Sequence, residues 1–341
     1  MPSSLPRSGG RVVRMVGTGT PEEAFEIGEA PEPQPAPGEI VVRVAASGVA
    51  FADVKMRHGI YPGMPSFPFV PGYDFAGTVE GIGEGVSEFR SGQAVAGLSF
   101  VGSHAEVIAL EPRYVAAMPN GTDPVKAAAL VLNYVTAYQM IERVARVPGG
   151  GTVLVHGGGG GMGTALLDLA RHRGFRAFAT ASRGKHDLVR RYGGEPIDYR
   201  TEDFVARMAA EGGADAVFDP IGGDHLSRSR AAAKRRGTVV GYGFAGAVDD
   251  KAIVRRTYVT FARMLLTPGP RARFYGILNP PFSRRRYIRA DLETLLGMLA
   301  EGAIDPHVGA TLPLRDAARA HAMLEAREAT GKIVLDVLRS A

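Results

Sequence analysis

The sequence predicts an α/β protein with two domains, one built on a doubly wound parallel sheet and the other mainly on β strands. The chain has 341 residues, about twice the length of a typical domain. Residues 11–130 contain short β-rich runs separated by Gly and Pro, a pattern typical of a compact barrel or sandwich. Residues 150–245 instead alternate strands with helices, as parallel βαβ units do.

The composition is that of a folded protein with an ordinary surface. Hydrophobic residues make up 45% and charged residues 22% of the chain, so a disordered protein is not expected. The net charge is only +5, and the short basic clusters at 234–236 and 284–286 lack interleaved aromatics, so nucleic-acid binding is not expected. We also expect no signal peptide and no membrane span. With no cysteine, the chain is predicted to be cytoplasmic.

The β-rich region is predicted from apolar runs and the turns between them. A helix is expected to follow from Pro124, because Asp123 is a plausible N-cap and proline suits the first helical position. The last strand, residues 331–337, is expected to rejoin the β domain and so to make the sheet domain an insertion. We predict a β domain over residues 1–132 and 275–341 and a sheet domain over 133–274. Examples of the predicted strands of the first region are 39–45, 75–80 and 93–97.

The second domain is predicted from an alternating pattern. Residues 152–156 form an unbroken apolar run, as a strand buried on both faces requires. Beyond residue 270 the regularity fades, and helices near 290–300 and 314–328 are predicted before the last strand. The remaining predicted elements are the helices 162–172, 185–192, 201–210 and 224–233 and the strands 176–181, 196–198, 216–219 and 237–241.

A glycine-rich turn follows the strand at 152–156. Gly158, Gly160 and Gly163 fall at GxGxxG spacing between this strand and a helix, the context in which the motif binds dinucleotides. The first glycine permits a sharp turn, the second lets the backbone approach a pyrophosphate, and the third lets helix and strand pack closely. Amides at the helix N-terminus then face the phosphates. The predicted cofactor site also includes Gly161 and Met162.

The end of the second strand indicates which dinucleotide binds. NAD-specific sites place an acidic residue there to accept from the ribose 2′-hydroxyl, but residues 180–185 contain none. Ser182, Arg183 and Lys185 can instead hold a 2′-phosphate by charge-assisted hydrogen bonds. Tyr199 follows the next strand and can flank the adenine or that phosphate. The sequence therefore predicts NADPH.

Segments along almost the whole chain carry a family pattern. In family order they are 48–53, 59–62, 71–77, 133–138, the glycine-rich turn, 181–186, 196–199, 219–223 and 331–333. The chain resembles the medium-chain dehydrogenase/reductases, in the zinc-free quinone oxidoreductase branch, and among these the vesicle amine transport protein-like quinone oxidoreductases. The resemblance implies a Rossmann domain, a GroES-like domain built from both chain ends, and a homodimer formed through the Rossmann domains.

The resemblance also implies that catalytic zinc is absent. Zinc-dependent relatives hold the metal with a cysteine and a Gly-His-Glu segment, and here residues 72–74 read Gly-Tyr-Asp in its place. His58, His104 and Asp53 have a spacing that fits no common metal site. We therefore expect no metal.

Catalytic and nicotinamide-binding roles are carried over from the family. Tyr61 matches the tyrosine proposed as proton donor in related enoyl reductases, and a phenol with the ordinary pKa near 10 can donate to a developing enolate. A purely structural role for Tyr61 stays open, in which case Tyr73 or solvent supplies the proton. Phe51 is expected to form an apolar wall. Nicotinamide binding is assigned to Asn133, Thr136 and the backbone of Gly241, Tyr242, Gly243 and Phe244.

One position departs from the family pattern. Quinone oxidoreductases usually have an asparagine near residue 50 that donates toward the nicotinamide or the substrate, whereas Ala50 has no donor. We predict an NADPH-dependent, zinc-independent reductase of quinones or α,β-unsaturated carbonyl compounds. Because of Ala50, two alternatives stay open: a zinc-free ketone or alcohol oxidoreductase, and an NADPH-binding protein with little turnover.

Overall fold

The fold was analysed in a computed structural model, which describes residues 5–246, 250, 252–277 and 283–340. The chain forms two compact units, a β unit of residues 1–135 and 286–341 and an α/β unit of residues 136–285. The sequence predicts junctions at 132/133 and 274/275, and the units of the structure divide at 135/136 and 285/286. Residues 278–282, close to the second junction, lie outside the described residues.

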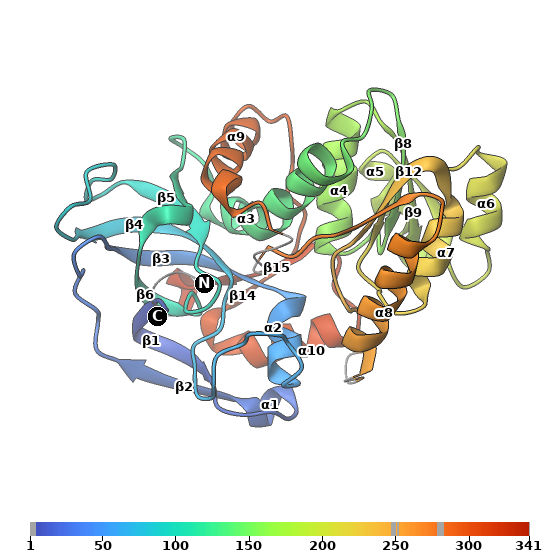
Figure 1. The fold of residues 1–341 in the computed structure, drawn as a ribbon. Helices are drawn as coiled ribbons and strands as arrows, with labels where there is room; N and C mark the ends of the chain where they lie inside the picture. The colour runs from blue at the N-terminus through green and yellow to red at the C-terminus, as the bar shows by residue number, and fades with distance from the viewer. Residues whose placement is uncertain (1–4, 247–249, 251, 278–282, 341) are drawn as a thin grey trace. The chain divides into compact units, whose positions relative to one another are not determined.

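The β unit is built on a nine-stranded sheet in the order β2-β1-β6-β3-β4-β5-β7, with β15 pairing β3 and β14 pairing β15 (Figure 1). Ile333 in β15 lies opposite Val49 in β3, so the last strand rejoins the first region of the chain, as predicted. Its strands are β1 (Arg7–Met15), β2 (Phe25–Ala30), β3 (Ile40–Val49), β4 (Asp74–Ile82), β5 (Ala94–Leu98), β6 (Ala105–Leu110), β7 (Val115–Ala117), β14 (Val308–Pro313) and β15 (Lys332–Asp336).

Among the described residues, five α-helices begin in the β unit, and one of them crosses the junction between the units. They are α1 (Pro21–Ala24), α2 (Phe51–Arg57), α3 (Pro124–Tyr138), α9 (Ile288–Ala300) and α10 (Ala317–Glu325). Asp123 accepts a hydrogen bond from the Val125 amide (2.9 Å) at the start of α3, as its predicted capping role requires. The predicted helix 314–328 is too long, because residues Leu314–Asp316 form a 3₁₀ turn and α10 ends at Glu325.

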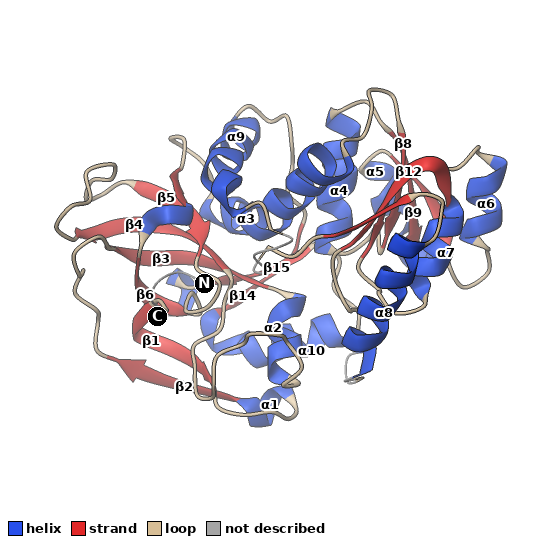
Figure 2. Ribbon diagram, in the orientation of Figure 1, coloured by secondary structure: helices blue, strands red, loops and turns tan. Residues whose placement is uncertain are grey.

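The α/β unit holds a six-stranded parallel sheet in the order β10-β9-β8-β11-β12-β13. This is the doubly wound order in which the chain starts at the centre and reverses direction once. Helices cover both faces of the sheet (Figure 2). The elements are β8 (Thr152–His156), α4 (Gly161–His172), β9 (Arg176–Ala181), α5 (His186–Arg191), β10 (Gly194–Asp198), α6 (Phe204–Ala210), β11 (Ala214–Asp219), α7 (His225–Ala232), β12 (Ala233–Gly241), α8 (Ala252–Leu266) and β13 (Arg271–Phe274).

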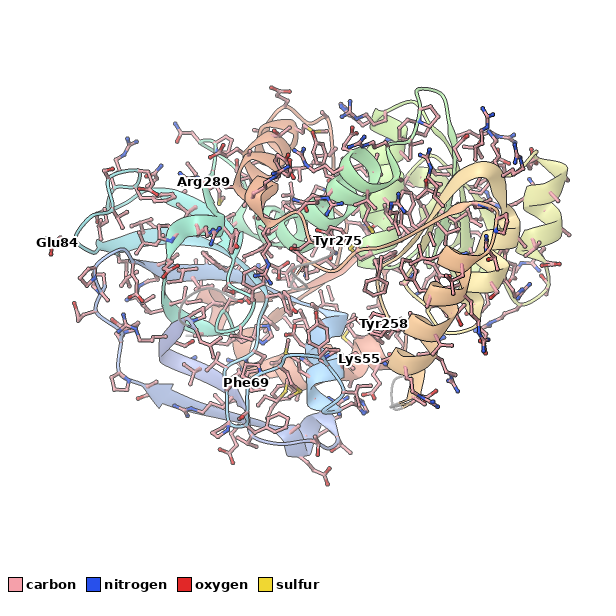
Figure 3. The ribbon with its side chains drawn as sticks, viewed as in Figure 1. Lys55, Phe69, Glu84, Tyr258, Tyr275 and Arg289 are labelled. Atoms are coloured by element: carbon pink, nitrogen blue, oxygen red, sulfur yellow. The ribbon has the colours of Figure 1, made fainter. Side chains whose placement is uncertain are left out.

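Several predicted elements differ from the observed ones at their ends. The helix predicted from 201 starts at Phe204, because the Asp203 carboxylate caps it by accepting from the Val205 amide (3.1 Å). Helix α8, strand β13 and the π-helix Gln139–Ala145 that follows α3 were not predicted from the sequence. That segment is held by Tyr275, labelled in Figure 3, whose hydroxyl donates to Gln139 Oε1 (3.0 Å). Among the described residues no helix combines the length and the apolar character that a membrane span requires.

Candidate functional site

The glycine-rich turn joins β8 to α4 at the carboxyl edge of the parallel sheet. Gly157 has φ +74°, in the left-handed region that favours glycine. Gly158 does not have a positive φ, so the prediction that Gly158 permits the sharp turn is wrong, and Gly157 has that role. Gly158 is needed for packing instead, because a Cβ there would lie 2.6 Å from the Cβ of Ala179 in β9.

The other two motif glycines differ in what surrounds them. A Cβ on Gly163 would lie 2.2 Å from the carbonyl oxygen of Gly157, so this glycine lets α4 pack against the turn, as predicted. A Cβ on Gly160, the N-cap of α4, would meet no atom closer than 3.5 Å. Packing therefore does not require glycine at this position, and the role expected of Gly160, close approach of the backbone to a phosphate, stays a prediction. Gly161 and Met162 form the first turn of α4 and are half-buried.

The predicted 2′-phosphate residues follow β9, where Ser182 precedes the 3₁₀ turn Arg183–Lys185. The Lys185 side chain lies on the glycine-rich turn, since a Cβ on Gly159 would be 2.7 Å from Lys185 Cδ. Partial burial lowers the pKa of Lys185 from its usual range. Arg183 is exposed and Ser182 is half-buried. The structure therefore brings a cation from the end of β9 onto the turn that opens α4.

The end of β10 contributes a tyrosine and a carboxylate. Tyr199 is 49% exposed, and the Arg200 guanidinium lies 5.9 Å from the centre of its ring. Asp198 lies opposite Ala181 in the register of β9 and β10. An acidic residue therefore lies near the end of β9, although it comes from β10 and not from residues 180–185. Its carboxylate is 8% exposed and accepts from the Arg200 backbone amide (3.1 Å).

The loop after β12 packs on the loop after β11. The amide of Tyr242 donates to the Asp219 carbonyl (3.0 Å), and a Cβ on Gly243 would lie 2.9 Å from the Pro220 carbonyl oxygen. The Tyr242 hydroxyl is buried, and among the described residues it has no hydrogen-bond partner. Burial raises the pKa of this phenol above its usual value. Gly241 ends β12, and Phe244 stacks on Phe274 with ring centres 5.8 Å apart.

Asn133 and Thr136 lie one turn apart on α3, on either side of the junction between the units. Each is 7% exposed. Residues three apart on a helix share a face, so these two side chains project to the same side of α3.

A buried polar cluster that the sequence analysis missed lies behind the glycine-rich turn. The Ser229 hydroxyl donates to Asp219 Oδ2 (2.6 Å) and contacts His156 Nε2 (3.2 Å) and His225 Nδ1 (3.4 Å). His225 Nδ1 also lies 2.9 Å from Asp219 Oδ2. Burial lowers the pKa of His156 to about 3. Burial opposes ionisation of Asp219, but the hydrogen bond from His225 and nearby charge lower its pKa to about 2.

This cluster is the one group among the described residues that offers three metal-ligating atoms close together, all within 4.8 Å of one another. The Ser229 hydroxyl contacts all three side chains, so their ligand atoms are already linked by hydrogen bonds. The cluster connects β8, β11 and α7 beneath the turn. The signal that could have found it is the histidine that ends an otherwise apolar strand.

In the β unit, the two candidate tyrosines are in contact. The Tyr73 hydroxyl donates to the Tyr61 hydroxyl oxygen at 2.7 Å, and the rings meet edge to face with centres 6.4 Å apart. Tyr73 is 1% exposed, and burial raises its pKa well above the usual range. Tyr61 is half-buried in the turn after α2.

The N-terminus of α2 holds Phe51, Ala50 and a buried acid. Ala50 is the N-cap, and its amide donates to Asp53 Oδ2 (2.9 Å), while the Gly72 amide lies 3.4 Å from Asp53 Oδ1. Phe51 is half-buried, and the ammonium of Lys55 (Figure 3) lies 5.7 Å from the centre of its ring. Ala50 has no side chain that can accept a hydrogen bond from the first turn of the helix. The Asp53 carboxylate instead accepts from the Ala50 amide at the helix N-terminus.

Burial raises the pKa of Asp53 to about 7, although the hydrogen bond from Ala50 and the charge of Lys332 oppose the rise. An acid whose pKa is higher in the folded state than in the unfolded state stabilises the fold most at low pH and loses that contribution as pH rises to the folded pKa. Raising the pH from 5 to 8 should therefore cost the native protein about 3 kcal/mol through this one group. Asp53→Asn should remove this loss. Urea unfolding of both proteins at the two pH values tests it, and equal pH dependence in both would contradict it.

The residues at the family's zinc position do not fit a catalytic zinc. Tyr73 is bonded to Tyr61, and Asp74 is paired with Lys332, whose Nζ donates to Oδ2 (2.8 Å) and Oδ1 (3.2 Å). Both members of this ion pair are buried, at 0% and 4% exposure, and no cysteine is present in the chain. Of the histidines considered from the sequence, His58 pairs with Glu325, and His104 is fully buried with its pKa lowered to about 4 by burial.

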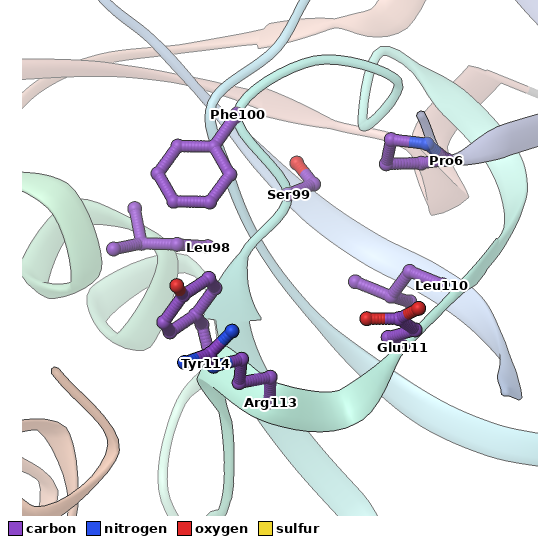
Figure 4. Close-up of a pocket in the computed structure, with 8 residues that line it drawn as sticks. All are labelled: Pro6, Leu98, Ser99, Phe100, Leu110, Glu111, Arg113 and Tyr114. Carbon is purple, nitrogen blue, oxygen red and sulfur yellow. The ribbon is translucent and has the colours of Figure 1, made fainter. Parts of the chain in front are cut away.

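The β unit also has a small cavity beside the loop that follows β5. It is lined by Leu98, Ser99, Phe100 and Tyr114, among others (Figure 4). Its volume of about 10 Å³ is close to the smallest that holds one water molecule. The cavity is therefore too small for a substrate.

Two family models match the chain. The alcohol dehydrogenase GroES-like domain matches residues 36–120, and the zinc-binding dehydrogenase family matches residues 193–335. The second name mentions zinc, but the residues at the position of the zinc ligands do not fit the metal.

Similar proteins include reductases and vesicle proteins. The synaptic vesicle membrane protein VAT-1 homolog of Rattus norvegicus is 32% identical over 317 residues, which cover 89% of this chain and 78% of the relative. The 2-haloacrylate reductase of Burkholderia sp is 32% identical over 313 residues, covering 88% of this chain and 91% of the relative. The Escherichia coli quinone oxidoreductase, solved in complex with NADPH, is 26% identical with a TM-score of 0.85, covering 96% of this chain and 100% of that one.

The fold, the glycine-rich turn and these similarities lead to one conclusion. The doubly wound sheet is the Rossmann fold predicted from the sequence, and residues 36–120 match a GroES-like domain. The chain belongs to the medium-chain dehydrogenase/reductase family, together with the VAT-1 homologues and the quinone oxidoreductases.

Proposed function

We propose that the protein is an NADPH-dependent reductase that works without zinc and reduces quinones or α,β-unsaturated carbonyl compounds. The observation that carries the proposal is the turn before α4, where a Cβ on Gly160 would meet no atom closer than the Gly157 carbonyl oxygen at 3.5 Å and the Lys185 side chain lies on Gly159. An open helix N-terminus beside a cation suits a dinucleotide with an additional phosphate. A quinone oxidoreductase bound to NADPH and a 2-haloacrylate reductase among the similar proteins support both the cofactor and the substrate class.

The residues that would hold the cofactor divide into two groups. The amides of Gly160–Gly163 would bind the pyrophosphate, while Ser182, Arg183 and Lys185 would hold the 2′-phosphate beside Tyr199. Bound NADPH would supply the hydride for the reduction. The nicotinamide end is assigned to Asn133, Thr136, Gly241, Tyr242, Gly243 and Phe244. The unpartnered Tyr242 hydroxyl is a further group in that set that fits a polar ligand.

The proton would come from Tyr61, with Phe51 as an apolar wall. Hydride addition to an enone or a quinone leaves an enolate or phenolate, which a neutral phenol can protonate. Asp74 is engaged by Lys332 and the Leu132 amide, and Tyr73 is bonded to Tyr61, so neither offers a metal-binding alternative.

The test is a steady-state assay of NADPH oxidation with quinone, enone and ketone panels, with and without a chelator. Turnover of a quinone or an enone that is insensitive to chelator supports the proposal. Turnover of ketones alone identifies the alcohol/ketone alternative, and binding of NADPH without turnover identifies the non-catalytic alternative. Ala50→Asn is the companion variant, and if it does not raise quinone turnover, Ala50 does not limit that reaction.

Lys185→Ala should weaken NADPH binding by about 10- to 100-fold, because a hydrogen bond to a charged group contributes about 1.5–3 kcal/mol. NADH lacks the 2′-phosphate, so the variant and the parent should bind it equally. Titration of both cofactors into both proteins measures this. Equal losses for NADPH and NADH would assign Lys185 to the fold, and a parent that preferred NADH would overturn the cofactor assignment.

We further propose that two copies associate through the α/β unit. Strand β13 lies at the edge of the six-stranded sheet, where its outer backbone groups can pair with another strand. Nearby at the C-terminus of α8, Leu265 and Leu266 are 57% and 85% exposed. An isologous pairing of two such edges would cover both features.

A further inference from the structure

Four aromatic side chains form a continuous edge-to-face series within the β unit. Tyr61 meets Tyr73, Tyr73 meets Phe100 with ring centres 6.2 Å apart, and Phe100 meets Tyr114 at 5.3 Å. The planes of each pair are tilted by 79–84°. Figure 4 shows the inner end of the series, with Phe100 and Tyr114 beside the small cavity. Edge-to-face contacts of this kind fix the orientation of each ring against the next.

Phe100 is held in a conformation that is rare for a residue with a side chain. Its φ is +68°, in the left-handed region. The amides of Ser99 and Phe100 both donate to the carbonyl oxygen of Tyr73, at 2.9 and 3.2 Å. These bonds fix the Tyr73 backbone to the Phe100 turn, while the Phe100 ring packs against the Tyr73 ring. Tyr73 is thus restrained through both its backbone and its side chain.

Tyr61 is the more exposed end of the aromatic series. The hydroxyl of Tyr73 donates a hydrogen bond to the Tyr61 oxygen at 2.7 Å. Tyr73 is 1% exposed, so a substrate cannot reach its hydroxyl as it can reach half-buried Tyr61. Burial keeps the pKa of Tyr73 well above its usual range, so Tyr73 retains its proton and remains a donor. Since Tyr73 donates in this pair, the Tyr61 proton is not used in the bond between them.

We propose that Tyr73 is a positioning residue, whose hydroxyl orients Tyr61 for proton donation and stabilises the phenolate that donation leaves. This rests on the proposed function. In the step, the O–H bond of Tyr61 breaks, its proton forms a new bond on the enolate or phenolate of the reduced substrate, and the electron pair stays on the Tyr61 oxygen. Water then returns a proton to Tyr61. A hydrogen bond to an ionised oxygen is stronger than one to a neutral oxygen, so the Tyr73 bond favours the ionised state.

The test compares Tyr73→Phe with Tyr114→Phe. Both variants remove a buried phenol oxygen from the same ring series and keep the ring, but only Tyr73 contacts Tyr61. The ionisation of Tyr61 is followed by the ultraviolet absorption of its phenolate during a pH titration without cofactor or substrate. To isolate the Tyr61 signal, the absorption of each protein's own Tyr61→Phe derivative is subtracted from that of the protein. We expect Tyr73→Phe to move this ionisation to higher pH by about one to two units, and Tyr114→Phe to leave it unchanged. Thermal melting of each variant verifies that it is folded.

The kinetic measurement uses the same variants with an enone that the parent reduces. Tyr73→Phe should lower kcat by about tenfold without changing KM for NADPH. In a protein that already carries Tyr61→Phe, adding Tyr73→Phe should not lower kcat further. An unchanged Tyr61 ionisation in folded Tyr73→Phe overturns the proposal, as does an equal shift in Tyr114→Phe. If Tyr61→Phe alone leaves kcat unchanged, the proton-donor assignment fails instead, and the titration still decides whether Tyr73 acts on Tyr61.

Discussion

Replacing Lys332 with methionine is expected to lower the free energy of unfolding by about 3–5 kcal/mol, because it leaves the buried Asp74 carboxylate without its partner charge. Asp74 is completely buried, and among the described residues the other donor to its carboxylate is the Leu132 amide at 3.2 Å. Methionine nearly preserves the length of the lysine stem, so lost packing contributes little. Gly48 shows how closely the pair is enclosed, since a Cβ there would lie 2.3 Å from Asp74 Oδ1. Urea unfolding of the full chain measures the loss.

The matched control is the double variant Lys332→Met with Asp74→Asn. A neutral amide can still accept from Leu132, so removing the carboxylate charge should recover most of the stability. If the double variant is as unstable as the single one, the loss comes from packing and not from an unpaired charge.

Tyr61→Phe is expected to lower kcat for an enone by about 10²- to 10⁴-fold, the range in which a general acid contributes. Phenylalanine keeps the ring against Tyr73 and removes only the oxygen. The dissociation constant for NADPH should be nearly unchanged, because the predicted phosphate-binding residues belong to the other unit. Single-turnover kinetics with the enone and fluorescence titration with NADPH provide the two values. A loss below about threefold would return Tyr61 to a structural role and make solvent the proton source.

The parallel sheet could be predicted closely where the strands are buried on both faces. Residues 153–155 and 177–179 are apolar, and β8 and β9 have the predicted bounds, 152–156 and 176–181. Strand β12 begins at Ala233, earlier than predicted, because its first residues are polar and carry no apolar pattern. Helix α8 lies where no strand–helix alternation was recognised, and its exposed leucines blur the amphipathic pattern.

The candidate site was predictable only where a local motif encodes it. Spacing and context identified the glycine-rich turn, but not that Gly157 has the left-handed conformation, since all of 157–161 are glycines. The contact between Tyr61 and Tyr73 depends on how the turn after α2 packs against the start of β4, and the pairing of Asp74 with Lys332 depends on how distant strands meet in the β sheet. Such pairings depend on tertiary structure and leave no periodic signal in the chain. The raised pKa of Asp53 is a further consequence of burial that its neighbours in sequence do not reveal.

The position of β15 has a consequence for the order in which the protein can fold as it is synthesised. Domains generally form from the N-terminus as the chain emerges, at about 5–20 residues per second. The β unit cannot follow this order, because β3 waits for a strand that is synthesised more than 280 residues later. Until then, the edge of β3 that receives β15 is unpaired and Asp74 lacks its counter-ion. The α/β unit is complete by residue 285. It can therefore fold while the first segment of the β unit, residues 1–135, still lacks the strands that follow residue 285. Nascent chains are therefore most exposed to edge-to-edge aggregation at β3, during the interval before β15 leaves the ribosome.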